Sequence, residues 1–361
     1  MAKVEIDTLK VEYDKNIVIL NKCQEEVKKQ IMTLLEEEAI VLGFPIQSRV
    51  KTFGSISEKL ESERFNVKKS LFELQDLVGF RIILLFLSDA VKVADIIEKR
   101  FSTIKIYNTV EKLNENEFGY SSIHIVSKIP ENWSLVPTLK DFKDIKFEIQ
   151  IRTLSQHIWA EASNVFQYKN EQDTPKSMNR AVSRVSALLE TIDNELERLA
   201  IEKANYIDSL ITLDTNQDIK LDVDVLNNGL GNKIPNNYEF TEKEDLSQIL
   251  ATLSAFNIEN RNQLFSLIDK HALSIIEFDE KIIKDLKIKN LIGEEWKIET
   301  KINGKDFRFK LTNEESKKRV LEKDTFFSKG GFISFILILE FGNDKVKDII
   351  KKVKEQSNNF L

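Results

Sequence analysis

The chain has 361 residues, and its 53 basic and 59 acidic side chains give a net charge of −6. Hydrophobic residues make up 42% of the chain and charged residues 31%, a balance typical of globular proteins rather than disordered ones. The single cysteine excludes a disulfide framework, and with only three histidines a Cys/His zinc site is excluded as well. The first residues lack the pattern of a signal peptide, and the longest apolar runs are too short to cross a bilayer. We therefore expect a cytoplasmic protein of two domains with no membrane contact.

Helical spacing dominates the start of the chain. Apolar residues recur every three or four positions from Leu9 to about Leu42 and predict one or two amphipathic helices. This helical region is expected to end near Gly43-Phe44-Pro45, because glycine and proline interrupt helices. A basic segment follows, and a further helical stretch is expected to run to Asp76.

Strands are predicted next along the chain. Val78–Phe86 is an apolar run rich in Val and Ile, which is typical of a buried strand. Ser88 is the expected N-cap of a helix that reaches Arg100. Three further strands are predicted at Ile104–Val110, Ser121–Lys128 and Ile145–Arg152.

Two long helices complete the first domain. One is predicted from Thr153 onward, and the other runs from Pro175 to about Ala204. The mixture of strands and helices over residues 40–170 predicts an α/β (α+β) domain in which a mixed sheet is flanked by helices. We place this domain at residues 1–204.

The second half of the chain differs in composition. Acidic side chains outnumber basic ones in residues 205–239, which we expect to be an acidic linker. Residues 240–361 then predict a small α+β module with a regulatory or sensor role. Its predicted elements are helices at Lys243–Phe256 and Asn260–His271, strands at Trp296–Lys301, Phe307–Leu311 and Phe332–Phe341, and a basic C-terminal helix.

The first of four polar clusters is basic. A polyphosphate requires several cations around its oxygens, and small side chains let those oxygens approach the backbone. This combination is present at Arg49, Lys51, Ser55 and Lys59. Taken alone, the same residues also suit an ordinary solvated surface.

Two clusters place carboxylates next to predicted strands. Asp76 comes just before a buried strand, and Glu148 shares one face of a later strand with Gln150 and Arg152. Carboxylate oxygens are ligands that Mg²⁺ takes together with phosphate and water. Arg81 alternates with apolar neighbours, so its side chain is expected to point away from them toward a cleft.

The last cluster follows a glycine at Gly119. Tyr120, Ser122 and His124 share one face of a predicted strand, and an exposed tyrosine can stack on a base. Each of the four clusters also has an ordinary surface or packing explanation, so the combination is more informative than any one of them.

The order and spacing of these motifs resemble the synthetase domain of the RelA/SpoT family, and are most similar to its small, stand-alone alarmone synthetases. The resemblance covers roughly Arg49 to Lys169 and does not extend over residues 210–361. It implies a nucleotidyltransferase-like mixed sheet. The motifs that carry it are RVK with SIxxK (49–59), DxxGxR (76–81), GYSSIH (119–124), EIQIRT (148–153) and WxxxxxxxxYK (159–169).

The resemblance also implies an activity. Members of the family move the β,γ-pyrophosphoryl group of ATP to the 3′-hydroxyl of GDP or GTP, making (p)ppGpp and AMP. By position, the donor ATP is assigned to Arg49, Lys51, Ser55, Lys59 and Arg81. Mg²⁺ is assigned to Asp76 and Glu148, and Glu148 is also the expected general base. The acceptor is assigned to Tyr120, His124, Gln150 and Arg152.

Two departures from the family pattern concern the acceptor. Residues 114–117 read Asn-Glu-Asn-Glu where guanosine-specific relatives usually place a cation, and Ser163-Asn164 stand where Glu-His is common. Acidic side chains there would repel a diphosphate. The alternative acceptor is the 3′ end of tRNA, as in toxic relatives that inhibit translation and are restrained by a C-terminal antitoxin-like domain, in some cases as a defence against phage. Such an enzyme would need a basic surface for tRNA and a protein trigger at its C-terminal module.

Other classes of protein are also open from the sequence. A non-catalytic nucleotide sensor would not need both Asp76 and Glu148, and a polymerase-like nucleotidyltransferase usually has paired acids on one strand. The hydrolase domain of long relatives is not expected, because none of the histidines at 124, 157 and 271 is followed by Asp. An oligomer remains possible.

Overall fold

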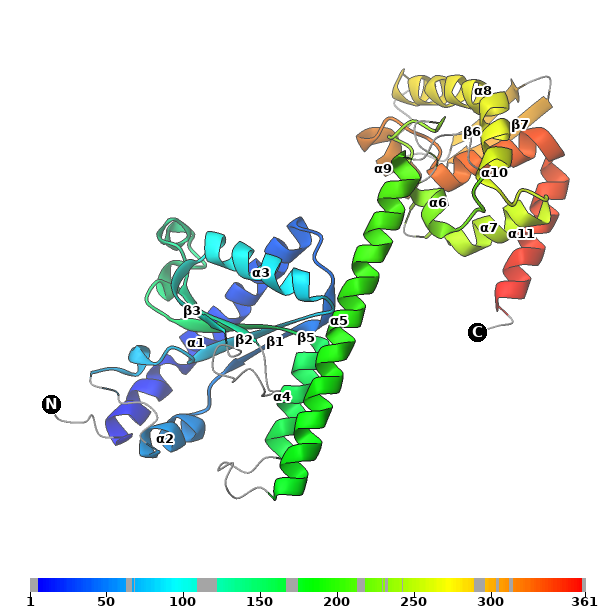
Figure 1. The fold of residues 1–361 in the computed structure, drawn as a ribbon. Helices are drawn as coiled ribbons and strands as arrows, with labels where there is room; N and C mark the ends of the chain where they lie inside the picture. Colours follow the sequence, from blue (N-terminus) through cyan, green and yellow to red (C-terminus); the bar gives the residue numbers. More distant parts are fainter. Residues whose placement is uncertain are drawn as a thin grey trace. The chain divides into compact units, whose positions relative to one another are not determined.

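The structure, a computed structural model, describes residues 6–62, 67, 69–108, 122–166, 175–212, 218–228, 230, 233–241, 243–288, 296–302, 305–311 and 314–358 (Figure 1). The chain divides into two compact units, Met1–Glu202 and Lys203–Leu361. Within the described residues, no helix combines the length and apolar character needed to cross a membrane.

A mixed sheet of five strands forms the centre of the first unit. Its strands are β1 (Leu42–Val50), β2 (Val78–Leu84), β3 (Ser102–Asn108), β4 (Ile123–Lys128) and β5 (Phe147–Thr153), in the order β1-β2-β5-β4-β3. Only β2 and β5 are parallel, and the other neighbours are antiparallel. The expected fold class, a mixed sheet flanked by helices, is confirmed, and the predicted strands at 78–86, 104–110, 121–128 and 145–152 match β2 to β5 with shifted ends.

The helices of this unit are α1 (Ile6–Glu37), α2 (Phe53–Glu61), α3 (Leu87–Arg100), α4 (Leu154–Phe166) and α5 (Lys176–Thr212), with short 3₁₀ turns η1 (Leu71–Glu73), η3 (Glu131–Leu135) and η4 (Lys140–Phe142). Helices α1 and α3 pack on the apolar face of the sheet, where alternating residues such as Phe80, Ile82 and Ile149 are fully buried. Because strand side chains alternate between faces, the remaining positions of β2 and β5 point to the opposite face. That second face carries the candidate site.

The start of the sheet differs from the prediction. Helix α1 ends at Glu37, and residues 43–45 lie within β1 instead of ending a helix. Strand β1 is at the edge of the sheet, and its pairing with β2 shifts between Phe44 and Gln47. An edge position and an irregular register are the places where a strand accommodates proline, here Pro45.

Helix α3 also begins differently from the prediction. It starts at Leu87, and the N-cap position is held by Phe86, whose side chain makes no capping hydrogen bond. The expected cap, Ser88, lies inside the first turn. Its backbone N–H donates to Glu197 Oε2 of α5 at 3.1 Å, so a carboxylate satisfies a free amide of the helix start.

The second unit is mostly helical and has its own core. Its elements are α6 (Val223–Asn228), α7 (Leu246–Ala255), α8 (Arg261–Ile288), β6 (Trp296–Ile302), β7 (Lys305–Leu311), α9 (Glu314–Glu322), α10 (Lys329–Phe341) and α11 (Asn343–Asn358). Strands β6 and β7 match the strands predicted at 296–301 and 307–311 and pair antiparallel. Residues 205–239, which were expected to be an acidic linker, include the end of α5 and all of α6 and supply Leu221, Val225 and Tyr238 to this core.

The predicted strand at 332–341 is wrong, because this segment belongs to helix α10. Ser328 caps the helix by accepting a hydrogen bond from the backbone N–H of Gly331 at 3.1 Å. Phe335 and Leu337, which are two residues apart and so lie on opposite sides of the helix, are both buried. A continuous apolar run cannot distinguish a buried strand from a helix buried all round, so periodicity gave no signal here.

One buried carboxylate in the second unit predicts a dependence of stability on pH. Asp279 is 1% exposed and accepts hydrogen bonds from the Tyr238 hydroxyl at 2.9 Å and from the backbone N–H groups of Phe326 and Phe327 at 3.1 Å. Burial raises the pKa of Asp279 to about 6 despite these donors. A carboxyl whose pKa is higher in the folded state stabilises the fold at low pH, and this contribution is lost as the pH rises through about 6.

We expect the unsubstituted chain to lose about 2 kcal/mol of unfolding free energy from this group between pH 4 and pH 7. Asp279→Asn should remove that part of the pH dependence, because an amide accepts from backbone N–H groups without carrying charge. Urea unfolding of the full-length chain at several pH values measures it, with Glu280→Gln on the exposed face of α8 as the control. Equal pH profiles for the parent and Asp279→Asn would contradict the assignment.

Candidate active site

A row of polar side chains crosses the open face of the five-stranded sheet. The register pairs Gln47 with Arg81, Arg81 with Gln150, Gln150 with His124, and His124 with Tyr107. Every strand therefore contributes one polar residue to the same line. Polar side chains at neighbouring positions on all the strands indicate a site rather than one solvated edge strand.

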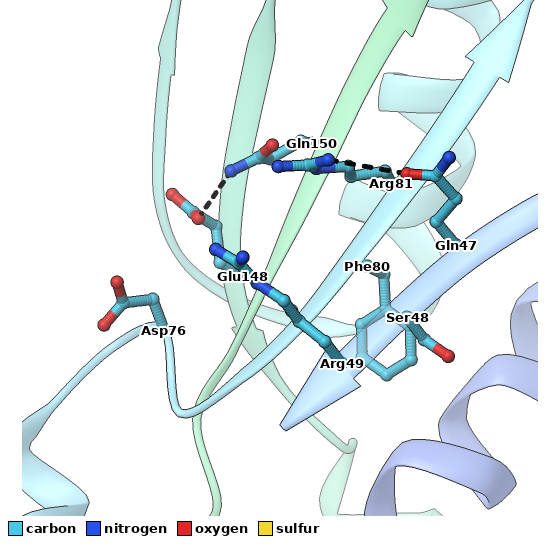
Figure 2. A pocket seen from close by; sticks show the side chains of 9 residues that line it. Gln47, Ser48, Arg49, Asp76, Phe80, Arg81, Glu148 and Gln150 are labelled. Atoms are coloured by element: carbon cyan, nitrogen blue, oxygen red, sulfur yellow. Dashed lines mark hydrogen bonds between the residues drawn. The ribbon is translucent and has the colours of Figure 1, made fainter. Parts of the chain in front are cut away.

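The pocket includes Gln47, Arg81 and Gln150 of this row and extends to the end of β2 that follows Asp76 (Figure 2). Gly79 pairs with Arg49 on one side and with Glu148 on the other. A Cβ at Gly79 would meet no atom within 4 Å, so the space between these two charged residues is open. The pocket is lined by Gln47, Ser48, Arg49, Asp76, Gly79, Phe80, Arg81, Glu148 and Gln150.

Two lysines hold Asp76 at one end of the pocket. Lys51 Nζ donates to Asp76 Oδ2 at 2.8 Å, and Lys59 Nζ donates to the same oxygen at 3.0 Å. Burial raises the pKa of Asp76, but the hydrogen bonds and charges of Lys51 and Lys59 outweigh it and hold this pKa below its ordinary value. The carboxylate is therefore ionised, and its second oxygen, Oδ1, is buried with no hydrogen-bond partner among the described residues.

Glu148 is the second carboxylate of the pocket and is surrounded by donors. The Tyr107 hydroxyl donates to Glu148 Oε1 at 2.7 Å, His124 Nδ1 lies 3.0 Å from the same oxygen, and Gln150 Nε2 donates to Oε2 at 3.0 Å. Burial raises the pKa of Glu148, whereas His124, Tyr107 and Gln150 lower it to a net value of about 2. Glu148 is thus ionised and fixed in orientation.

The basic residues predicted for a polyphosphate fall in two groups. Lys51 and Lys59 already face Asp76, whereas Arg49 lines the pocket, is exposed, and has no ion pair within the described ranges. Ser55 is in the first turn of α2, where its backbone N–H donates to the capping Thr52 Oγ1 at 3.4 Å. The structure places Ser55 at a helix N-terminus but not in the pocket lining.

Arg81 and Arg152 have different surroundings. Arg81 lines the pocket as expected, and its Nη1 donates to Gln47 Oε1 at 3.4 Å and to Glu161 Oε1 of α4 at 2.9 Å. Arg152 is 1% exposed, and its guanidinium donates to Gln150 Oε1 at 3.3 Å. Arg152 is therefore placed to support Gln150 from below the surface.

Only some of the residues predicted to bind the acceptor lie within the described part of the chain. Tyr120 and residues 114–117, which include Glu115 and Glu117, lie outside the described residues, as do Tyr168 and Lys169. His124, expected to reach the acceptor's phosphates, instead contacts Glu148 and lies with Nε2 2.6 Å from Ser122 Oγ.

The sequence did not predict the lining residues Gln47, Ser48 and Phe80, or the neighbouring residues Tyr107 and Glu161. Tyr107 reaches Glu148 across the intervening strand β4, a contact that needs the strand order and not the sequence alone. Gln47 was missed because β1 was not predicted as a strand, and Glu161 was missed because its contact with Arg81 depends on how α4 packs against the sheet.

The two carboxylates suit Mg²⁺. Both line the same pocket, both are ionised, and Asp76 Oδ1 has a buried lone pair with no protein partner in the described part of the chain. Within that same part, no group of three or more His, Cys, Asp or Glu side chains is arranged as a metal site. Two protein carboxylates completed by phosphate oxygens and water are the usual arrangement for Mg²⁺ with a nucleotide.

The sequence profile described as the region found in RelA / SpoT proteins matches residues 48–173, which run from the last residues of β1 through α4 and include every residue of the pocket except Gln47. The first half of the chain contains a RelA/SpoT synthetase domain. Two Bacillus subtilis relatives, the GTP pyrophosphokinases YwaC and YjbM, are 25% and 27% identical over 209 and 195 residues. These alignments cover 55% and 52% of this chain and 94% and 88% of the relatives.

Solved structures also resemble the synthetase domain. The crystal structure of small alarmone synthetase 1 from Bacillus subtilis is 26% identical with a TM-score of 0.44, and the match covers 54% of this chain and 98% of that one. A second crystal structure of small alarmone synthetase 1 from Bacillus subtilis, bound to its product pppGpp, is 27% identical with a TM-score of 0.43. That match covers 53% of this chain and 97% of the other.

Proposed function

We propose that this chain transfers the β,γ-pyrophosphoryl group of ATP to the 3′-hydroxyl of GDP or GTP, with AMP as the second product. The observation that carries the proposal is the pocket itself, where the carboxylates Asp76 and Glu148 share one cavity with Arg49 and Arg81. Lys51 and Lys59 form ion pairs with Asp76 at the edge of this pocket. This combination suits polyphosphate chemistry, which is achieved by positioning and charge neutralisation.

The basic residues would bind the donor. Arg49, exposed at the pocket, would contact phosphate oxygens, and Arg81 would contact the adenine or the phosphates after releasing Glu161. Lys51 and Lys59 would share their charge between Asp76 and the polyphosphate. Ser55, at the start of α2, would lie near the same phosphates, because helix N-termini favour anions.

Asp76 and Glu148 would hold Mg²⁺, which neutralises phosphate charge and polarises the transferred group when bound. The side chains around the two carboxylates keep them ionised without any metal, since the pKa values of Asp76 and Glu148 are both lowered. At neutral pH both carboxylates would therefore be charged ligands for a cation.

Glu148 would also orient the attacking hydroxyl. The 3′-oxygen forms a bond to the β-phosphorus as the bond from that phosphorus to the α,β-bridging oxygen breaks, and AMP leaves. A carboxylate with a pKa of about 2 is a weak base, so Glu148 would accept the hydroxyl proton late, as the new bond forms. Little base catalysis is needed when the transition state is loose.

The residues proposed to bind the acceptor make fewer contacts within the described part of the chain. Tyr120 would stack on the guanine, Gln150 would line the acceptor side of the pocket, and Arg152 would support Gln150. His124 would reach the acceptor's phosphates only by giving up one of its present contacts. Residues 205–361 would regulate the enzyme, with Lys203–Leu361 forming a separate compact unit.

The acceptor is tested with ATP labelled on the γ-phosphate and offered with GDP, GTP or bulk tRNA in separate reactions. The full-length chain is compared with a chain that ends after Glu202, the limit of the first unit. We expect label on the guanosine nucleotides. Label on tRNA alone would favour the translation-blocking alternative, and greater transfer by the shorter chain would show that the second unit restrains the first. No transfer of label by either chain would contradict the proposed function.

A further inference from the structure

Glu148 Oε1 receives two contacts from two different strands. The Tyr107 hydroxyl of β3 donates to it at 2.7 Å, and His124 Nδ1 of β4 lies 3.0 Å away. On the other oxygen, Gln150 donates at 3.0 Å. Both oxygens of the carboxylate are therefore held by neighbouring side chains.

Tyr107 and His124 are also fixed against each other. The register pairs them across β3 and β4, and their rings stack with centroids 4.8 Å apart and an interplanar angle of 21°. Lys105 Nζ lies 5.0 Å from the centroid of the Tyr107 ring. Stacking at this separation restricts rotation of both rings, so the two contacts to Glu148 Oε1 are made from defined directions.

A tyrosine on a half-buried strand is most often a packing residue. The ring of Tyr107 does pack on His124, but its hydroxyl bonds a charged side chain two strands away in the sheet order β3-β4-β5. Hydrogen bonds to a carboxylate are stronger and more directional than neutral ones. A packing role would not require the hydroxyl, and the two roles can therefore be separated by removing that group alone.

We propose that Tyr107 is a positioning residue, which together with His124 orients the Glu148 carboxylate for divalent-cation binding. The proposal rests on the proposed function for its cation. Groups that hydrogen-bond a metal ligand fix its orientation, and their removal typically lowers metal affinity by about 10–100-fold. Tyr107 would act from β3, a strand that contributes no residue to the lining of the pocket.

The test uses Mn²⁺ as the probe, with its binding to the full-length chain followed by electron paramagnetic resonance. Tyr107→Phe keeps the ring and its stack on His124 but removes the hydroxyl. We expect it to raise the Kd for Mn²⁺ by about 10-fold. Turnover of the variant should need a correspondingly higher Mg²⁺ concentration and recover when Mg²⁺ is saturating.

The matched control is Tyr206→Phe, because the Tyr206 hydroxyl also donates to a carboxylate, Asp222 Oδ2 at 2.8 Å, outside the pocket. It should leave the Kd for Mn²⁺ unchanged. Glu148→Gln defines the site by abolishing Mn²⁺ binding there. If Glu148→Gln abolishes binding but Tyr107→Phe changes the Kd by less than about 2-fold, the positioning role is overturned while the metal assignment stands. If Glu148→Gln has no effect on Mn²⁺ binding, both fail.

Discussion

Replacing Asp76 with Asn or Glu148 with Gln is expected to lower the rate of pyrophosphoryl transfer by about 10³-fold or more. Both carboxylates line the pocket, and each would supply a charged ligand that an amide cannot replace. Steady-state formation of AMP measures the effect, with the variants compared at equal concentration. Loss of either carboxylate should lower kcat more than it weakens the binding of ATP, because Arg49 and Arg81 remain in the pocket.

The control for this pair is Glu161→Gln. Glu161 is half-exposed on α4 and contacts Arg81, but it is not part of the pocket lining. Its replacement should change the rate by less than about 10-fold, since an exposed ion pair contributes little. Far-UV circular dichroism confirms that each variant is folded. Turnover near the parental rate in Asp76→Asn or Glu148→Gln would refute the roles given to these carboxylates.

Removal of the Lys51 charge is expected to have the second largest effect. Lys51 is 13% exposed and donates to Asp76 Oδ2 at 2.8 Å, so its ammonium lies next to the carboxylate and beside the pocket. Lys51→Met keeps the length of the side chain, and we expect kcat/KM for ATP to fall by about 10²-fold because a preorganised charge is lost. The same change on the protein surface, Lys29→Met, removes only an exposed pair with Glu26 and should have no effect.

The pH profile distinguishes this role of Lys51 from a general loss of binding. Lys51 and Lys59 lower the pKa of Asp76 against the effect of burial, so the parent keeps this carboxylate ionised into the acid range. With Lys51 removed, burial raises that pKa, and the acid limb of the kcat/KM profile should move to higher pH. An acid limb at the same pH in the parent and in Lys51→Met would contradict the coupling between Lys51 and Asp76.

Much of the site could be predicted because its residues lie next to recognisable strands. Asp76 precedes an apolar run that had to be buried, and the alternation in β5 separates Glu148 and Gln150 from the buried isoleucines. Alternation also predicted that Arg81 would point away from the core, and the pocket lining includes it. These inferences need only the period of a strand.

Contacts that depend on strand order could not be predicted. The hydrogen bond between Tyr107 and Glu148 requires β4 to lie between β3 and β5, an order that local patterns do not reveal. The edge strand β1 was missed because Gly43 and Pro45 are signals for a break, although an edge position tolerates both. In α10, uniform burial removed the periodicity that would have identified a helix.

The most direct test of the central claim is the fate of ATP labelled on its α-phosphate. The purified full-length chain is incubated with this ATP, Mg²⁺ and GDP, and Asp76→Asn serves as the background. A pyrophosphoryl transfer predicts that the label appears in AMP and that its formation depends on GDP. Label in ADP, or label attached to the acceptor with release of pyrophosphate, would show a different bond being broken and would contradict the function proposed for this pocket.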